Sequence, residues 1–357
     1  MRRISGHHAK VGMTLTRPVY DNAGMLLFHQ ATVLEEPDVS KLMIYGVNEI
    51  IISDPRVDDV PVQPLVAPEI EAEVGRAVRD LIYETPPGSP MEPMLMQAIE
   101  KSVFAMAREF FPEVLGEANV SGGATEDDYR FMRTAKVASA AMFLGRNSGM
   151  TMIDVAQLGL AAVLMDVSNT RYEIPNLVDF AAANLNPSEI ARREPLVAVE
   201  MLKSTGRVQP DILLAVGQHH ERWNGSGYPA GLAGEAISPQ ARILAVCDAF
   251  FDLVSSLPGR PAAKPHEAGE FLMASSGDLF DPELVEEFIH LVPLYPTGIT
   301  VGLNTGEVGI VSNGNLGFVG RPIVRVILDE RGKVVPYDLD LASLENLGKL
   351  VTRVMDF

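Results

Sequence analysis

The stretch of sequence that decides the fold is His219-His220-Glu221-Arg222-Trp223-Asn224-Gly225-Ser226-Gly227-Tyr228-Pro229. It begins at the end of an apolar helix predicted over residues 210–218 and continues into a glycine-rich loop. Adjacent side chains on a helix point about 100° apart, but at a helix end they can converge on one site. Neutral imidazoles are common ligands of divalent first-row metals, and Asp or Glu side chains can complete such a site. The alternative, from these residues alone, is one surface histidine and one satisfied core histidine.

Around this stretch, helical periodicity dominates the chain and predicts a mainly α protein. Further helices are predicted over residues 69–83, 93–111, 126–147, 151–167, 187–204, 239–255 and 281–291. The first 56 residues predict a small β-rich domain, with a hairpin that turns at 21–24, a helix over 35–45 and a strand over 47–52. From residue 295 onward, β-branched residues and turns predict a second β-rich unit.

These patterns divide the chain into four parts. We expect a small β-rich N-terminal domain over residues 1–56, a linker with a helix over 57–92, a central helical bundle over 93–293 and a β-rich C-terminal subdomain over 294–357.

Composition narrows the classes of partner and location. The 357 residues carry a formal net charge of −18 and form no evident basic patch, so duplex DNA is not an expected partner. The longest apolar run, residues 155–165, is far shorter than the roughly 20 residues that a bilayer span needs. A single cysteine, Cys247, leaves His and carboxylate groups as the metal ligands. With no signal-peptide pattern at the N-terminus, we expect a cytoplasmic protein without a membrane span.

The quoted stretch resembles the signature of the HD-GYP family, whose members cleave cyclic di-GMP at a two- or three-metal centre inside a helical domain. The resemblance covers roughly residues 127–288. It includes Ala241-Arg242-Ile243-Leu244-Ala245-Val246-Cys247-Asp248, which is similar to the family's helix that ends in a metal-binding aspartate. The resemblance therefore implies an HD-type helical bundle for residues 93–293.

The family's site residues carry over one position at a time. The resemblance implies a ligand set of Asp166, Glu194, His219, His220 and Asp248. The chain departs from the family pattern at several positions: Arg133, Met165 and Glu194 stand where histidine is usual, Asn169 where lysine is usual, and Asn224 where aspartate is usual. The family's His-Asp pair is thus half lost, and Asp166 is its surviving member.

The retained ligands suffice for one divalent transition metal, Fe, Mn or Zn, and a second metal is not expected. Phosphodiester hydrolysis commonly uses one cation to activate a water and another to neutralise the developing oxygen charge. We expect the positive charge of Arg133 to replace one of these cations. Its guanidinium would either hold a phosphate or pair with Asp166 or Asp248.

The resemblance implies roles for two further features of the sequence. Arg260 lies near the family's phosphate-contacting arginine, although a surface-loop arginine is the alternative from sequence alone. The loop that contains Gly225, Gly227, Tyr228 and Pro229 borders the family's active site, and the resemblance implies contact with a signalling protein there. Glycine and proline also shape tight loops without any such role.

Two functions are compatible with these observations. One is an active metal-dependent cyclic di-GMP phosphodiesterase in which Asp166 is the catalytic ligand. The other is a degenerate HD-GYP protein of cyclic di-GMP signalling, which senses cyclic di-GMP or a related cyclic dinucleotide, or contacts a protein, with little or no hydrolysis. Metal-site residues act as a unit, so the changes at Arg133, Met165 and Asn169 favour the second hypothesis.

Overall fold

The N-terminal part of the chain forms two small antiparallel sheets and one helix. The computed structural model describes the whole chain except residues 22–23, 48, 63, 86–90, 112–128, 169–186, 256–260, 316–317 and 356–357. Strand β1 (Arg2–Ser5) pairs with β4 (Glu49–Ile52), and β2 (Val19–Tyr20) pairs with β3 (Leu26–Phe28). Helix α1 (Glu36–Ile44) precedes β4. The expected hairpin is confirmed, whereas the pairing of β1 with β4 was not predicted.

The central part is helical, as the mainly α prediction required. Its helices are α2 (Pro68–Glu84), α3 (Pro93–Glu109), α4 (Tyr129–Asn147), α5 (Met152–Leu164), α8 (Pro187–Ser204), α9 (Pro210–Gln218), α10 (Pro239–Leu253), α11 (Pro265–Ala274) and α12 (Pro282–Leu291). All of these except α4 and α5 begin at a proline. Proline suits the first helical position because its fixed φ matches the helix and the N–H that it lacks would have no partner there.

One continuous hydrophobic core joins these helices. It contains the fully buried rings of Phe110, Phe250 and Phe288, and it also includes buried side chains of α2, which lies within the expected linker range. A Cβ atom at Gly159 would lie 1.7 Å from the Met142 methyl carbon, so α5 approaches α4 closely at this glycine. That approach places the end of α5 beside α4. Within the described residues, the structure has no helix long and apolar enough to cross a bilayer.

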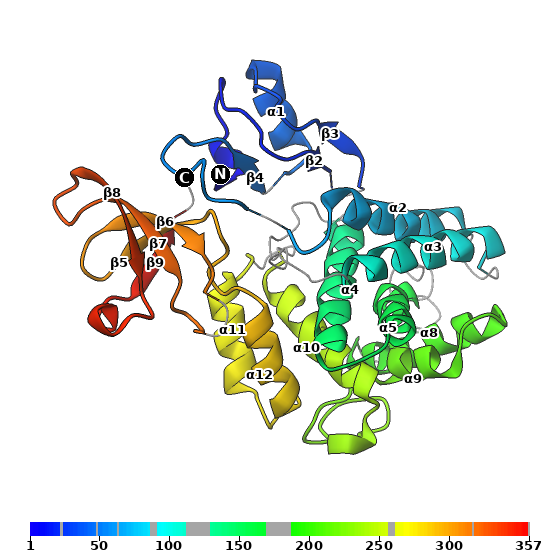
Figure 1. Cartoon of the computed structure of the whole chain (residues 1–357). Coiled ribbons are helices and arrows are strands. Elements are labelled where there is room, and N and C mark those ends of the chain that lie inside the picture. The colour runs from blue at the N-terminus through cyan, green and yellow to red at the C-terminus, as the bar shows by residue number, and fades with distance from the viewer. Residues whose placement is uncertain are drawn as a thin grey trace.

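The C-terminal part is a five-stranded antiparallel sheet in the order β8-β7-β6-β5-β9. Its strands are β5 (Thr300–Leu303), β6 (Val308–Asn313), β7 (Ile323–Leu328), β8 (Val334–Asp340) and β9 (Val351–Met355). Helices α11 and α12 stand between this sheet and the other helices (Figure 1). The predicted architecture of a helical core with small β-rich units at both ends is therefore confirmed.

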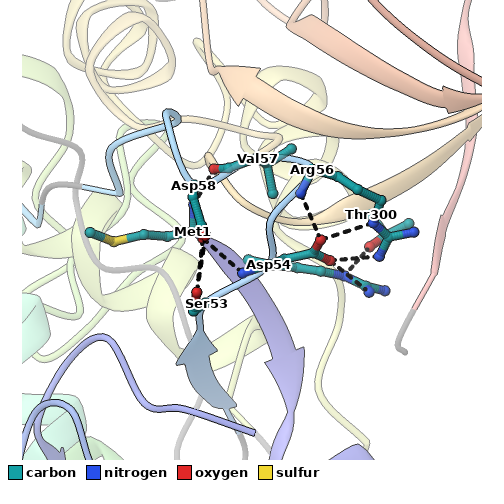
Figure 2. A network of polar contacts seen from close by, with 8 residues as sticks. Met1, Ser53, Asp54, Arg56, Val57, Asp58 and Thr300 are labelled. Atoms are coloured by element: carbon teal, nitrogen blue, oxygen red, sulfur yellow. Dashed lines mark hydrogen bonds and ion pairs between the residues drawn. The ribbon is translucent and has the colours of Figure 1, made fainter.

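The N-terminal domain and the C-terminal sheet touch through a polar network and a small apolar cluster. Arg2 donates to the Thr300 hydroxyl over 3.2 Å and pairs with Asp54, which Arg56 also contacts at 2.6 Å (Figure 2). Val57 and Val60 pack against Ile310 and Ile327 of the sheet. The two β-rich parts, far apart in sequence, are thus joined directly.

Candidate metal centre

Two helix ends and the middle of a third helix bring four potential ligands together. Asp166 follows the end of α5, Glu194 lies within α8, and His219 and His220 follow α9. One ligand atom from each of these residues lies within 4.8 Å of those of the others. Two imidazoles and two carboxylates at this spacing suit a divalent transition metal. The sequence singled out all four residues.

A hydrogen bond to a backbone carbonyl fixes the orientation of the His219 ring. This side chain is fully buried, and its Nδ1 lies 2.7 Å from the Val216 carbonyl oxygen, so an Nδ1–H donates there. In a neutral imidazole with this hydrogen bond, the other ring nitrogen, Nε2, has a lone pair that can bind a metal, and it faces Glu194 Oε2 at 4.0 Å. Neither of these two buried atoms has a hydrogen-bond partner among the described residues. Buried polar atoms nearly always have a hydrogen-bond partner. Two such atoms that face each other without one, His219 Nε2 and Glu194 Oε2, therefore suit a cation bound between them.

Glu194 is only 7% exposed, and this burial chiefly explains why the pKa of its carboxyl is raised to about 8. Repulsion from Asp166 acts in the same direction, whereas a hydrogen bond from the Ser168 hydroxyl to Glu194 Oε1 opposes it. A carboxyl with so high a pKa lacks a compensating positive charge. A bound cation would supply that charge.

His220 belongs to the ligand group and also contacts the following loop. Its ring centroid is 3.9 Å from that of His219 and 4.8 Å from that of Tyr228. Burial, with a smaller contribution from the neighbouring His219, lowers the pKa of His220 to about 3. The imidazole is therefore neutral near pH 7 and can act as a ligand.

Arg133 brings a fixed positive charge to the edge of this group. Its guanidinium donates to Asp248 Oδ1 over 2.7 Å and to the Asp248 carbonyl over 3.1 Å, and it lies 3.7 Å from Asp166 Oδ2. Burial alone would lower the pKa of Arg133, but the two carboxylates raise it above the ordinary value. Of the two alternatives that the sequence left open for Arg133, the structure shows the carboxylate pairing.

Asp248 is consequently engaged by an arginine. Burial alone would raise its pKa, yet Arg133 and the neighbouring histidines hold it below the ordinary value. Asp248 is not one of the four residues whose ligand atoms gather within 4.8 Å, so its predicted role as a metal ligand stays a prediction.

The loop after His220 is held by a residue whose role the sequence analysis did not identify. Glu221 is 1% exposed, and its two carboxylate oxygens accept the backbone N–H groups of Ala230 and Leu232 over 2.7 and 2.9 Å. A Cβ at Gly227 would lie 2.3 Å from the Arg222 nitrogen, so the loop crosses this backbone where only glycine fits. The loop thereby seats Tyr228 against His220.

The remaining predicted positions lie outside the group of four ligands. Met165 is 1% exposed and packs in the hydrophobic core. The Asn224 amide donates to Asp278 over 2.6 Å, and its oxygen accepts from the Ser226 N–H. Asn224 therefore shapes the loop. Arg260 and Asn169 lie outside the described residues.

Comparisons with known proteins agree with this architecture. Residues 124–284 match the family described as HD domain. A cyclic di-GMP phosphodiesterase of Pseudomonas aeruginosa is 31% identical over 237 residues, which are 65% of this chain and 56% of the relative. A cyclic di-GMP phosphodiesterase response regulator of Xanthomonas campestris is 34% identical over 158 residues, 43% of this chain and 41% of the relative. One from Thermotoga maritima is 27% identical, covering 66% of this chain and 65% of the relative. The chain thus spans roughly half of the length of the first two relatives.

Proposed function

Because the chain belongs to the HD-GYP family, we propose that it binds a cyclic dinucleotide of the cyclic di-GMP class beside a single divalent metal ion, and that it hydrolyses this ligand slowly or not at all. The similar proteins from Pseudomonas, Xanthomonas and Thermotoga are named cyclic di-GMP phosphodiesterases, which supports the class of ligand. The limit on hydrolysis is part of the proposal because the resemblance implies that Arg133, Met165 and Asn169 stand where the family pattern has other residues.

Asp166, Glu194, His219 and His220 would hold the metal. A bound divalent ion supplies positive charge for a phosphate oxygen and lowers the pKa of a water molecule. The unpartnered Glu194 Oε2 and His219 Nε2 support an ion at this position. Iron, manganese and zinc all accept such mixed nitrogen and oxygen ligands.

The pairing of Arg133 with Asp248 is the observation on which the limited hydrolysis rests. A second divalent ion would need carboxylates at this edge of the site, and the Arg133 guanidinium already contacts Asp248 at 2.7 Å and approaches Asp166 at 3.7 Å. Its positive charge also repels a second cation at close range. One cation can still bind a phosphate, but the pair of cations that phosphodiester hydrolysis commonly uses is not available.

We propose that Arg133 also takes part in binding the nucleotide. A guanidinium can hold a phosphate with two hydrogen bonds, and Arg133 lies at the edge of the metal ligands. Tyr228 packs on His220, so the loop of Gly225, Gly227, Tyr228 and Pro229 borders the same site. We propose this loop as the contact for a signalling protein.

Two measurements on the purified full chain test the proposed function. Titration of Mn²⁺-treated protein with cyclic di-GMP is expected to show saturable binding that His219→Ala weakens. Chromatography of the nucleotide after incubation is expected to show little linear product. Turnover at rates typical of enzymes, roughly 1 per second or faster, would contradict the proposal and support the alternative, an active phosphodiesterase with Asp166 as a catalytic ligand.

A further inference from the structure

Ser168 is a buried residue that contacts the candidate metal centre from outside the ligand group. Only 3% of its surface is exposed, and it lies two positions after Asp166. Its hydroxyl donates to Glu194 Oε1, and its oxygen also lies 3.2 Å from the Glu194 carbonyl oxygen. Ser168 thus links the segment after α5 to α8, which is 26 residues away along the chain.

The Ser168 hydrogen bond distinguishes the two oxygens of Glu194. Oε1 accepts the hydroxyl, whereas Oε2 is buried without a partner among the described residues. Oε2 is also the oxygen that faces His219 Nε2 at 4.0 Å. A carboxylate held by one oxygen loses its freedom to rotate and presents the other in a defined direction.

We propose that Ser168 is a positioning residue that presents Glu194 to the metal as a ligand through one oxygen, Oε2. This inference rests on the metal site of the proposed function and adds the residue that orients one of its ligands. Without the hydroxyl, Glu194 could turn its carboxylate away from the site or offer both oxygens to the cation. Hydrogen bonds to metal ligands of this kind commonly account for 10–100-fold in metal affinity.

The test compares two buried serines. Ser168→Ala removes the hydrogen bond to Glu194. Ser102→Ala is the matched control, because Ser102 is 1% exposed and its hydroxyl donates to the Ile99 carbonyl over 3.1 Å, in α3. The probe is Co²⁺, whose visible absorption changes with the number and geometry of its ligands. Each protein is titrated with Co²⁺ alone, without nucleotide.

We expect Ser168→Ala to bind Co²⁺ roughly 10–100-fold more weakly than the unmodified protein and to give a different visible spectrum at saturation. Ser102→Ala should match the unmodified protein in both measurements. The role of Ser168 is overturned if its variant keeps the affinity and spectrum of the unmodified protein, if affinity falls while the spectrum stays the same, or if Ser102→Ala loses as much affinity. Failure of the unmodified protein to take up Co²⁺ would instead overturn the metal site of the proposed function, and the role of Ser168 with it.

Discussion

Replacing Arg133 with methionine tests the role of its guanidinium in the site. Met fills much of the same volume but cannot donate to Asp248, whose carboxylate would be left buried and charged without its 2.7 Å partner. The side chains of Arg133 and Asp248 are 11% and 15% exposed, so solvent would compensate little of the loss. Removing one partner of a buried ion pair costs about 3–5 kcal/mol. We therefore expect the metal-free variant to unfold at a temperature lower by on the order of 10 °C.

The same variant should respond to metal more strongly than the unmodified protein. With the guanidinium gone, Asp248 and Asp166 become available to a cation, and a divalent ion that binds the folded state raises its stability. Thermal unfolding with a chelator and then with excess Mn²⁺ measures both effects. Arg207→Met, at an exposed position, is the matched control and should change the free energy of unfolding by no more than about 0.5 kcal/mol. A loss below about 1 kcal/mol for Arg133→Met in the presence of chelator would refute this account of the ion pair.

Three further changes have defined outcomes. The pKa of Asp54 lies at about 2, below its ordinary 3.8, chiefly because Arg56 donates to it, so its contribution to stability is complete above about pH 4 and is lost as the pH falls through 2. Asp54→Asn should therefore destabilise the protein at pH 7 and have little effect near pH 2 in denaturant titrations. Glu221→Gln replaces a buried, charged acceptor of two backbone N–H groups by a neutral amide with one oxygen, and we expect calorimetry to show a loss of about 1–3 kcal/mol, while the same change at the exposed Glu235 has no such effect. Arg133→His combined with Met165→His should gain a second metal by elemental analysis, and comparable uptake by either single variant would contradict this expectation.

Much of the helical architecture could be predicted because apolar spacing and helix-starting prolines indicate the same helices. Apolar residues at helical spacing, with proline at the first position, predicted α3, α8, α9 and α10 closely. Helix α11 was missed because its ten residues provide few apolar repeats, although the Glu267 carboxylate accepts the Lys264 backbone N–H at its start. Strand β1 was missed because four residues rich in arginine do not alternate, and its partner β4 lies about 50 residues away.

For the candidate site, the sequence was enough to identify the ligand residues but not the contacts that these residues make with distant segments. The motif and its resemblance singled out the four gathered ligands, and the spacing drew attention to Arg133. Which carboxylate Arg133 would pair with depended on how α4 and α10 pack. The bond from Ser168 to Glu194 joins distant segments, so no local pattern could reveal it. Glu221 lay within the quoted motif, but its two backbone partners come from the returning half of the loop.

We propose that this site takes one metal ion because Arg133 occupies the place of a second cation. The most direct measurement is elemental analysis of the purified chain after equilibration with excess Mn²⁺ or Fe²⁺ and removal of unbound metal. Chain concentration comes from amino-acid analysis, and His219→Ala gives the background. We expect one tightly bound ion per chain in the unmodified protein and none in His219→Ala. Two stoichiometric ions in the unmodified protein would contradict it, because the guanidinium and a second cation would then share the carboxylates of Asp166 and Asp248.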